Sequence, residues 1–189
     1  MEPGDALPRP IGLTTDDQET VLTPARLEDV SELYAVIDRN RTYLREWLPW
    51  VTPEYGLEEA RGFVADRLVE HERRRALMCV VRYRGEIAGA IGLHTIDAVN
   101  RATSIGYWLD EAHRGRGIMT RACRAVVTAA FREYGLHRVE IRCATGNERS
   151  CAIPRRLGFV EDGILREAGF LRDRWVDLRV FSALEQEWR

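Results

Sequence analysis

A glycine-rich turn between a strand-like segment and a long helix places the strongest constraint on this chain. The turn, Arg-Gly-Arg-Gly at 114–117, follows the strand-like segment 102–109 and opens a helical pattern over 118–134. Glycine lets a backbone turn tightly and approach a ligand with no Cβ in the way. The first N–H groups of a helix are unpaired and lie at the positive end of its dipole. The turn therefore predicts an anion site that suits a pyrophosphate.

Two well-known phosphate loops do not fit this turn. A Walker loop requires Gly-Lys-Ser or Gly-Lys-Thr, and a dinucleotide fingerprint requires a third glycine in an early βαβ unit; neither is found here. The other alternative is an ordinary exposed turn. The strand and the helix on either side favour phosphate binding over that alternative.

The remaining segments predict one α/β domain at 18–189, after a flexible lead-in at 1–17 that is rich in proline and glycine. Strands are expected at 19–25, 77–83, 86–94, 102–109, 138–144, 159–167 and 175–184. Helices are expected near 30–37, 57–75, 118–134 and 148–158, with a short helix or turn at 42–50. Asp29 and Glu32 have the spacing of a capping box. One strand face is predicted to hold Ile87, Gly89, Ile91 and Leu93.

The composition argues against several classes of protein. A net charge of -2 lacks the basic excess of a general nucleic-acid binder. No stretch approaches the roughly 20 apolar residues of a membrane span, and the first residues show no signal-peptide pattern. The four cysteines form no CxxC pair, so we expect no metal site and no disulfide framework, and a reducing, cytoplasmic compartment.

The turn resembles motif A of the GNAT superfamily of N-acyltransferases, which reads Gln/Arg-x-x-Gly-x-Gly/Ala. Its last position here is Met119, a departure that is similar to the version in Rim-type enzymes, the ribosomal-protein N-terminal acetyltransferases. Further segments resemble the same branch: Leu44–Trp50, Ile105–Leu109, Asn147 with Ser150, and Arg156–Phe159. The resemblance covers about residues 19–188, and the predicted order of strands and helices matches the GNAT fold.

The resemblance implies an acetyl-CoA-dependent N-acetyltransferase with a mixed, mostly antiparallel sheet of six to seven strands flanked by helices. Coenzyme A would wedge between two splayed central strands, 102–109 and 138–144, with no metal. The residues implied to bind it are Ile105, Tyr107, Arg114, Gly115, Arg116, Gly117, Ile118, Met119, Thr120, Asn147 and Ser150. Rim-type relatives also imply a homodimer.

Such a reaction needs a deprotonated amine, a stabilised oxyanion and a partner for the departing thiolate. By resemblance, a backbone N–H near Tyr107 would face the oxyanion. Ser150 would contact the sulfur, although a serine in the first turn of a helix can instead bond the local backbone. Asn147 either binds the pantetheine arm or only caps the helix. Cys143 is expected to be a buried apolar cysteine and not a nucleophile.

The sequence does not identify a general base. Some Rim-type relatives carry a glutamate that aligns with Gly169, so that base is missing, and Glu46, His94 and Asp97 are substitutes that are each compatible with a structural role. An α-amine has a pKa of about 7.7–8.0, so about a tenth of it is neutral at pH 7 and a water relay could suffice.

The acceptor side is expected to include Glu46, Trp47, Trp50 and His94, and the two tryptophans are equally compatible with core packing. The resemblance favours a protein N-terminal amine as acceptor. One alternative is a small-molecule amine, such as a polyamine, an amino sugar or a peptide antibiotic. The other is a weakly active acyl-CoA-binding sensor, which the loss of the glutamate at Gly169 favours and the intact segment 114–120 with Ser150 opposes. Acidic groove residues would favour a cationic small substrate, and a long open groove would favour a protein terminus.

Overall fold

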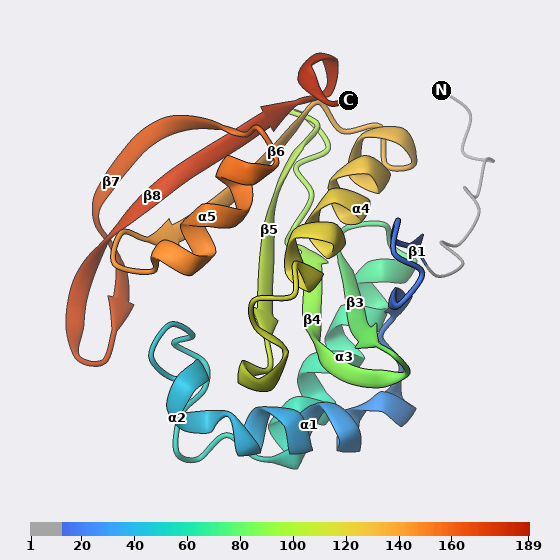
Figure 1. Cartoon of the computed structure of the whole chain (residues 1–189), viewed down its shortest axis with the longest axis vertical. Helices are drawn as coiled ribbons and strands as arrows, with labels where there is room; N and C mark the ends of the chain where they lie inside the picture. Colours follow the sequence, from blue (N-terminus) through green and yellow to red (C-terminus); the bar gives the residue numbers. More distant parts are fainter. Residues whose placement is uncertain (1–12) are drawn as a thin grey trace.

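The computed structural model describes residues 13–189, which form a curved sheet with helices on both faces (Figure 1). The strands are β1 (Leu13–Thr14), β2 (Thr20–Pro24), β3 (Leu77–Tyr83), β4 (Glu86–Leu93), β5 (Ala102–Leu109), β6 (Arg138–Ala144), β7 (Val160–Leu171) and β8 (Arg174–Leu184). The helices are α1 (Val30–Arg39), α2 (Arg41–Leu44), α3 (Leu57–Glu72), α4 (Ile118–Arg132) and α5 (Glu148–Arg156).

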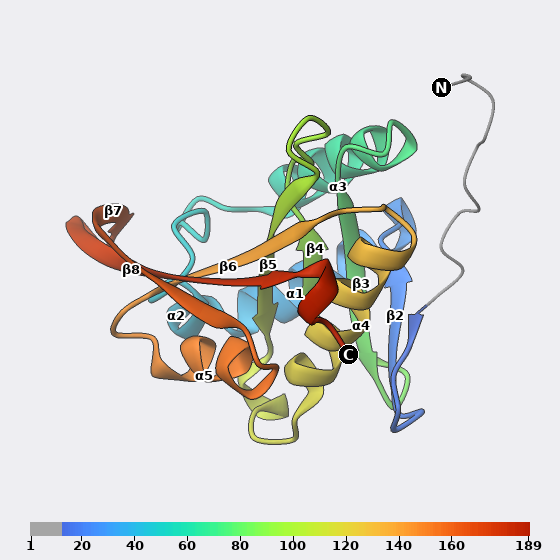
Figure 2. The same cartoon turned by 90° about the horizontal axis from the view of Figure 1, so that it is seen from above.

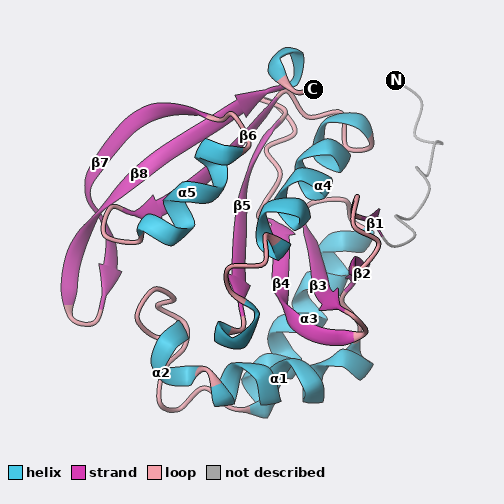
Figure 3. Cartoon of the chain, in the orientation of Figure 1, coloured by secondary structure: helices cyan, strands magenta, loops and turns pink. Residues whose placement is uncertain are grey.

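The strands form one eight-stranded sheet in the order β1-β2-β3-β4-β5-β6-β8-β7 (Figure 3). Every neighbouring pair is antiparallel except β5 and β6, which are parallel because α4 crosses over between them. The mixed, mostly antiparallel α/β fold predicted from the sequence is confirmed. The sheet exceeds the expected six to seven strands because the two-residue β1 adds an edge strand.

The two larger hydrophobic cores occupy opposite faces of this sheet. Figure 2 shows α3 on one side of the sheet and α4 and α5 on the other. The larger core lies under α4 and α5 and includes Ile91, Ile105, Val126 and Ile141. The smaller core lies under α1 and α3 and includes Val30, Leu33, Val64, Val80 and Ala90. Because side chains alternate along a strand, odd positions of β5 face α4 and even positions face α3.

The parallel pairing of β5 with β6 ends halfway along both strands. The register runs from Ala102 opposite Arg138 to Ile105 opposite Ile141 and goes no further. β5 continues beside β4, whereas β6 continues beside β8, so the two strands diverge from that point (Figure 1). The splayed central strands predicted from the family resemblance are therefore present.

Two local predictions were wrong, one about a helix cap and one about a strand face. Asp29 and Glu32 do not cap each other: Asp29 accepts from the Arg26 N–H, and Glu32 accepts from the Ile87 N–H of β4. Ile87 packs in the core under α3 while Ile91 packs under α4, because a bulge at Ala88 flips the alternation.

The N-terminal lead-in predicted at 1–17 falls mostly outside the described residues. Its described end contains β1 and a turn in which Asp17 accepts from the Thr20 N–H and pairs with Arg121 of α4 at 2.6 Å. This end of the segment is therefore bound to both the sheet and α4.

Candidate active site

A groove of about 1790 Å³ crosses the molecule at the point where β5 and β6 diverge. We call its two parts the α4 half and the α3 half, after the helices beside them. The α4 half is lined by Ile105, Tyr107, Arg114, Gly115, Gly117, Ile118, Met119, Thr120, Asn147 and Ser150. The α3 half is lined by Trp47, Trp50, Phe63, Arg67, His94, Gly106 and Arg142. The groove thus collects most of the residues that the sequence singled out.

The backbone of β5 presents polar groups to the gap between the strands. Ser104 O accepts from His94 N at 2.8 Å and Asp110 N donates to Ala88 O at 2.7 Å, so even positions point toward β4. Since successive residues point to opposite edges, Ile105 and Tyr107 direct their N–H and C=O groups toward β6. Beyond Ile105 the β6 ladder has ended, so the Tyr107 N–H faces the groove.

The N-terminus of α4 opens into the same space. Gly115 and Gly117 have φ values of 75° and 72°, the left-handed region that glycine tolerates best. The first intrahelical bond is from Arg121 N to Gly117 O, so the N–H groups of 118–120 precede the helical ladder. These unpaired groups and the helix dipole form the anion site that the sequence predicted.

The arginines of the turn lie differently from one another. The Arg114 guanidinium pairs with Glu111 and stacks over the Tyr43 ring, 4.8 Å from its centroid. Arg116 is exposed, does not line the groove, and lies over the Tyr83 ring on the outside of the turn. The geometry therefore does not support the expected contact of Arg116 with the cofactor, because Gly117 turns the chain between Arg116 and the helix.

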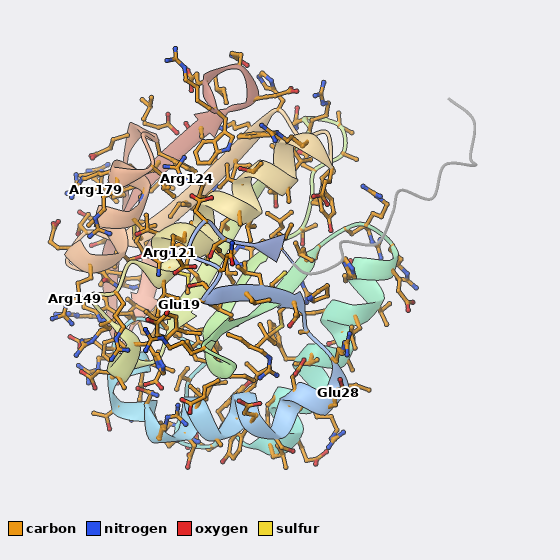
Figure 4. The ribbon with its side chains drawn as sticks, turned by 45° about the vertical axis from the view of Figure 1, so that its right-hand side comes forward. Glu19, Glu28, Arg121, Arg124, Arg149 and Arg179 are labelled. Carbon is orange, nitrogen blue, oxygen red and sulfur yellow. The ribbon has the colours of Figure 1, made fainter. Side chains whose placement is uncertain are left out.

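Two arginines that the sequence reading left out also line the α4 half, Arg149 and Arg156 of α5. Arg156 donates to the Thr120 hydroxyl at 3.1 Å, at the mouth of the anion site. Figure 4 shows Arg121 and Arg124 of α4, Arg149 of α5 and Arg179 of β8 on one flank of the molecule. An i, i+7 spacing on a short helix is the only sequence signal that pairs Arg149 with Arg156.

Tyr107, Ser150 and Asn147 form a hydrogen-bonded set beside the gap. The Tyr107 hydroxyl donates to Ser150 O at 3.1 Å and accepts from the Ser150 hydroxyl at 3.2 Å. Asn147 Oδ1 accepts from Ser150 N at 3.1 Å, so Asn147 caps α5, as one of its two interpretations required. Burial raises the pKa of Tyr107 well above its usual value, so the phenol keeps its proton.

Cys143 is 5% exposed and lies at the edge of the groove. Burial and a hydrogen bond with Cys151 raise the pKa of its thiol. A thiol with a raised pKa carries little thiolate, which is the nucleophilic form. The expectation of a buried, unreactive cysteine agrees with this environment.

His94 lies across Gly106 on the face of β5 that points toward α3. A Cβ on Gly106 would meet His94 Nε2 at 2.4 Å, and His94 Nδ1 lies 2.9 Å from the Ser104 hydroxyl. Gly106 must therefore be a glycine for the imidazole to rest on the strand. Desolvation in the groove, together with the charges of Arg67 and Arg142, lowers the pKa of His94.

The other candidate bases lie elsewhere. Glu46 is exposed and does not line the groove. Asp97 holds the loop before β5 through the N–H groups of Val99 and Asn100 at 3.0 and 2.9 Å. Gly169 does line the groove, but a Cβ there would lie 3.1 Å from both Leu178 and Val176. Of these positions, His94 alone brings a titratable side chain into the groove.

Trp47 and Trp50 both line the groove and neither belongs to a core cluster. Trp50 is 39% exposed and tilts against Tyr55 with ring centroids 5.2 Å apart. The Trp47 ring lies 3.8 Å from a Cβ built on Gly146, so it reaches from the end of α2 to the loop between β6 and α5. The core-packing alternative was therefore wrong for these tryptophans.

A buried polar cluster at Asp110 positions the turn and was missed in the sequence. Its carboxylate accepts from Arg39 at 2.6 Å, Asn40 at 3.0 Å and the Ala112 N–H at 3.1 Å, while Asn40 also accepts from the Glu111 N–H. Burial alone would raise the pKa of Asp110, but these hydrogen bonds outweigh it and lower the pKa. The cluster ties the end of β5 to the end of α1 and so joins the two halves of the groove.

Comparison with known proteins identifies this arrangement. Residues 19–160 match the acetyltransferase (GNAT) domain family, and the chain belongs to that family. It is 35% identical to YdaF of Bacillus subtilis (strain 168), provisionally named a ribosomal N-acetyltransferase, over 85% of this chain and 88% of that protein. It is 32% identical to the ribosomal-protein-serine acetyltransferase of Escherichia coli (strain K12), over 82% and 87% of the two chains. The fold superimposes on RimL, a ribosomal L7/L12 α-N-protein acetyltransferase solved with coenzyme A, with a TM-score of 0.88, 28% identity, and coverage of 92% and 98%.

Residues 13–189, which the structure describes, contain no group of three or more His, Cys, Asp or Glu side chains placed to hold a metal ion. Within the same residues, no helix has the length and apolar character needed to cross a membrane.

Proposed function

We propose that this chain transfers the acetyl group of acetyl-CoA to the N-terminal α-amine of a protein. The observation that carries the proposal is the groove at the split between β5 and β6, with backbone N–H groups at one end and an imidazole at the other. Support also comes from relatives that are named ribosomal-protein acetyltransferases and from the neighbour solved with coenzyme A.

The α4 half fits the cosubstrate. The N–H groups of 118–120, Arg114 and Arg156 would hold the pyrophosphate, and the free edge of β5 would bond the pantetheine arm through Ile105 and Tyr107. This route leads the thioester to the point where the strands part. Asn147, whose Oδ1 is engaged in capping α5, keeps its amide N–H groups for the arm.

His94 is the general base in this proposal. Its lowered pKa leaves the imidazole neutral at pH 7, as a base must be. The amine nitrogen attacks the thioester carbon and passes its proton to His94, while the Tyr107 N–H stabilises the oxyanion that forms. The carbon–sulfur bond then breaks, and the Ser150 hydroxyl exchanges its hydrogen bond to Tyr107 for one that it donates to the departing thiolate.

The proposal also covers the location of the enzyme, its oligomeric state and its partners. A cytoplasmic location is supported by four cysteines that are all free and buried. A homodimer is supported by exposed apolar side chains on the β7–β8 hairpin, namely Ile164, Leu165, Phe170 and Trp175. Nucleic acid is not proposed as a partner, because the net charge of -2 gives no basic excess.

The test is acetylation of a short peptide that begins with serine, followed by mass spectrometry. Addition of one acetyl group to the free peptide, and none to the same peptide with a blocked N-terminus, is the expected result. A protein that binds acetyl-CoA in a calorimetric titration but acetylates a small amine and no peptide would overturn the choice of acceptor. A folded protein that binds no acetyl-CoA would overturn the proposal as a whole.

A further inference from the structure

The charged side chains that line the groove are mostly positive. They are six arginines and one glutamate: Arg67, Arg114, Arg121, Arg142, Arg149, Arg156 and Glu111. Four of these arginines lie on α4, α5 or the turn, where Arg114 and Arg156 are proposed to hold the pyrophosphate and Arg121 pairs with Asp17. Arg67 and Arg142 lie instead in the α3 half, and both are close enough to His94 for their charges to lower its pKa.

Arg67 has no carboxylate partner within ion-pair distance among residues 13–189. It extends from α3 into the groove, with its guanidinium over the Phe63 ring at 5.6 Å from the centroid. Its Nε is buried and donates to nothing in the described structure. A buried guanidinium N–H without an acceptor is costly, so an acceptor supplied by a ligand would be strongly favoured here.

Arg142 lies on β6 just past the point where the strands part. It shares Glu140 with Arg138, its Nη2 being 2.8 Å from the Glu140 carboxylate, and its side chain is 51% exposed. Because Arg138 is also paired with Asp162 at 2.7 Å, the charges of this group balance, and the half-exposed Arg142 keeps guanidinium N–H groups that can reach a ligand.

From this geometry we infer that the acceptor carries an acidic side chain close behind its N-terminal amine, and that Arg67, with Arg142 opposite, binds that carboxylate. The inference rests on the proposed function, because it assumes that the α3 half receives the acceptor. Arg67 is a specificity-determining residue in this scheme, and His94 lies between the carboxylate and the reacting amine.

The same charges argue against the cationic small acceptors that the sequence left open. A polyamine would bring a second positive charge into a half that contains two guanidinium groups and no carboxylate at its lining. Like charges in a partly desolvated site repel, and specificity often depends on such repulsion. Acidic groove residues, which would have favoured a polyamine, are absent from the described lining of the α3 half.

The experiment compares three peptides that begin with serine and differ only at the next two positions, which are glutamate, glutamine or arginine. The wild-type protein should show a kcat/KM about tenfold higher for the acidic peptide than for the neutral one, the lower end for a hydrogen bond to a charged group. The basic peptide should be the poorest substrate, and high salt should reduce all the differences.

Two variants of α3 make the test specific. Arg67→Glu should abolish the preference for the acidic peptide and favour the basic one, with acetyl-CoA affinity unchanged. Arg61→Glu is the matched control, because Arg61 is exposed on the same helix and does not line the groove; it should leave the preference intact. Arg67→Lys keeps a charge and should retain part of the preference.

The outcomes separate the two proposals. Equal kcat/KM for all three peptides, or an acidic preference that survives in Arg67→Glu, would overturn this inference while the proposed function stands. Failure to acetylate any peptide, with acetyl-CoA bound, would overturn the proposed acceptor and this inference with it.

Discussion

The two halves of the groove differ in the chemical groups that form them. The α4 half is formed largely by backbone: the free edge of β5, the glycine turn at 115–117 and the first N–H groups of α4. The α3 half is formed by side chains that come from distant segments, among them Trp47, Arg67, His94 and Arg142. A site made of backbone serves one invariant ligand, whereas a site made of side chains can differ from one relative to the next. Acetyl-CoA binding is thus a property of the fold in this proposal, and choice of acceptor is a property of this chain.

Removal of the Asp110 carboxylate, which joins the two halves of the groove, should have the largest effect. Asp110→Ala leaves Asn40, Arg39 and the Ala112 N–H without their acceptor. We expect the free energy of unfolding to fall by about 3 kcal/mol, because buried donors lose the carboxylate that accepts from them. Chemical denaturation at pH 7 would measure it, with Asp66→Ala, an exposed position on α3, as the control.

The sign of the pH dependence follows from the lowered pKa of Asp110. The stabilising contribution is present above the unfolded pKa of about 3.9 and is lost as the pH falls through the lower folded value. The difference in stability between wild type and Asp110→Ala should therefore shrink in acid. A difference that is constant from neutral pH to acid would contradict the role of the carboxylate charge.

The α4 half, which is formed largely by backbone, should be sensitive to substitution of a single glycine. Gly117→Val places a branched side chain at a φ of 72° and disturbs the N–H groups that follow. We expect the Kd for acetyl-CoA to rise about 100-fold, or about 2.7 kcal/mol. Gly135→Val, at a φ of 61° with nothing within 4 Å of the added Cβ, is the matched control for strain. If both variants weaken binding equally, the effect comes from destabilisation and not from the anion site.

A substitution in the α3 half should instead affect turnover and the pH dependence of turnover. His94→Gln is expected to lower kcat/KM about 100-fold at neutral pH with acetyl-CoA affinity unchanged. Because the pKa of His94 is lowered, the wild-type profile should steepen only below the ordinary histidine value of about 6.5. The pH profile of His94→Gln should show only the dependence that comes from ionisation of the acceptor amine. Glu46→Gln and Asp97→Asn are the controls, and a loss of activity in either would move the base to that residue.

The smallest effect is expected at the Ser150 hydroxyl, which lies in the α4 half beside Tyr107. Ser150→Ala removes the hydroxyl beside Tyr107 but keeps the capped N–H, so kcat should fall about tenfold while the Kd for acetyl-CoA stays the same. Tyr107→Phe should resemble it, because the two hydroxyls bond each other. Single-turnover measurement separates the chemical step from product release. An unchanged rate would remove Ser150 from the mechanism.

The sequence was informative about the α4 half for a physical reason. A backbone site needs glycines at fixed offsets from a strand and a helix, and such requirements are local in the chain. The turn at 114–117, the helix after it and the set of Tyr107, Asn147 and Ser150 could therefore be read directly or by resemblance. Most strands were placed within a few residues of their observed ends, because the alternation of side chains is also local. The position of the Arg116 side chain depends on the fold, which directs it over the Tyr83 ring and away from the groove, so its contact with the cofactor stays a prediction.

The sequence by itself determined the α/β class, the order of the elements, the motif A turn and the resemblance to the acetyltransferase family. Only the tertiary structure decided which side chains share the α3 half, because Trp47, Arg67, His94 and Arg142 come from four separate segments of the chain and no spacing relates them. It also placed His94, and neither Glu46 nor Asp97, in the groove, since the lining of a groove depends on what packs around a residue and not on its place in the chain. The bulge at Ala88 and the buried Asp110 cluster were also decided by the tertiary structure. Each depends on partners far away in the sequence, which only folding brings together.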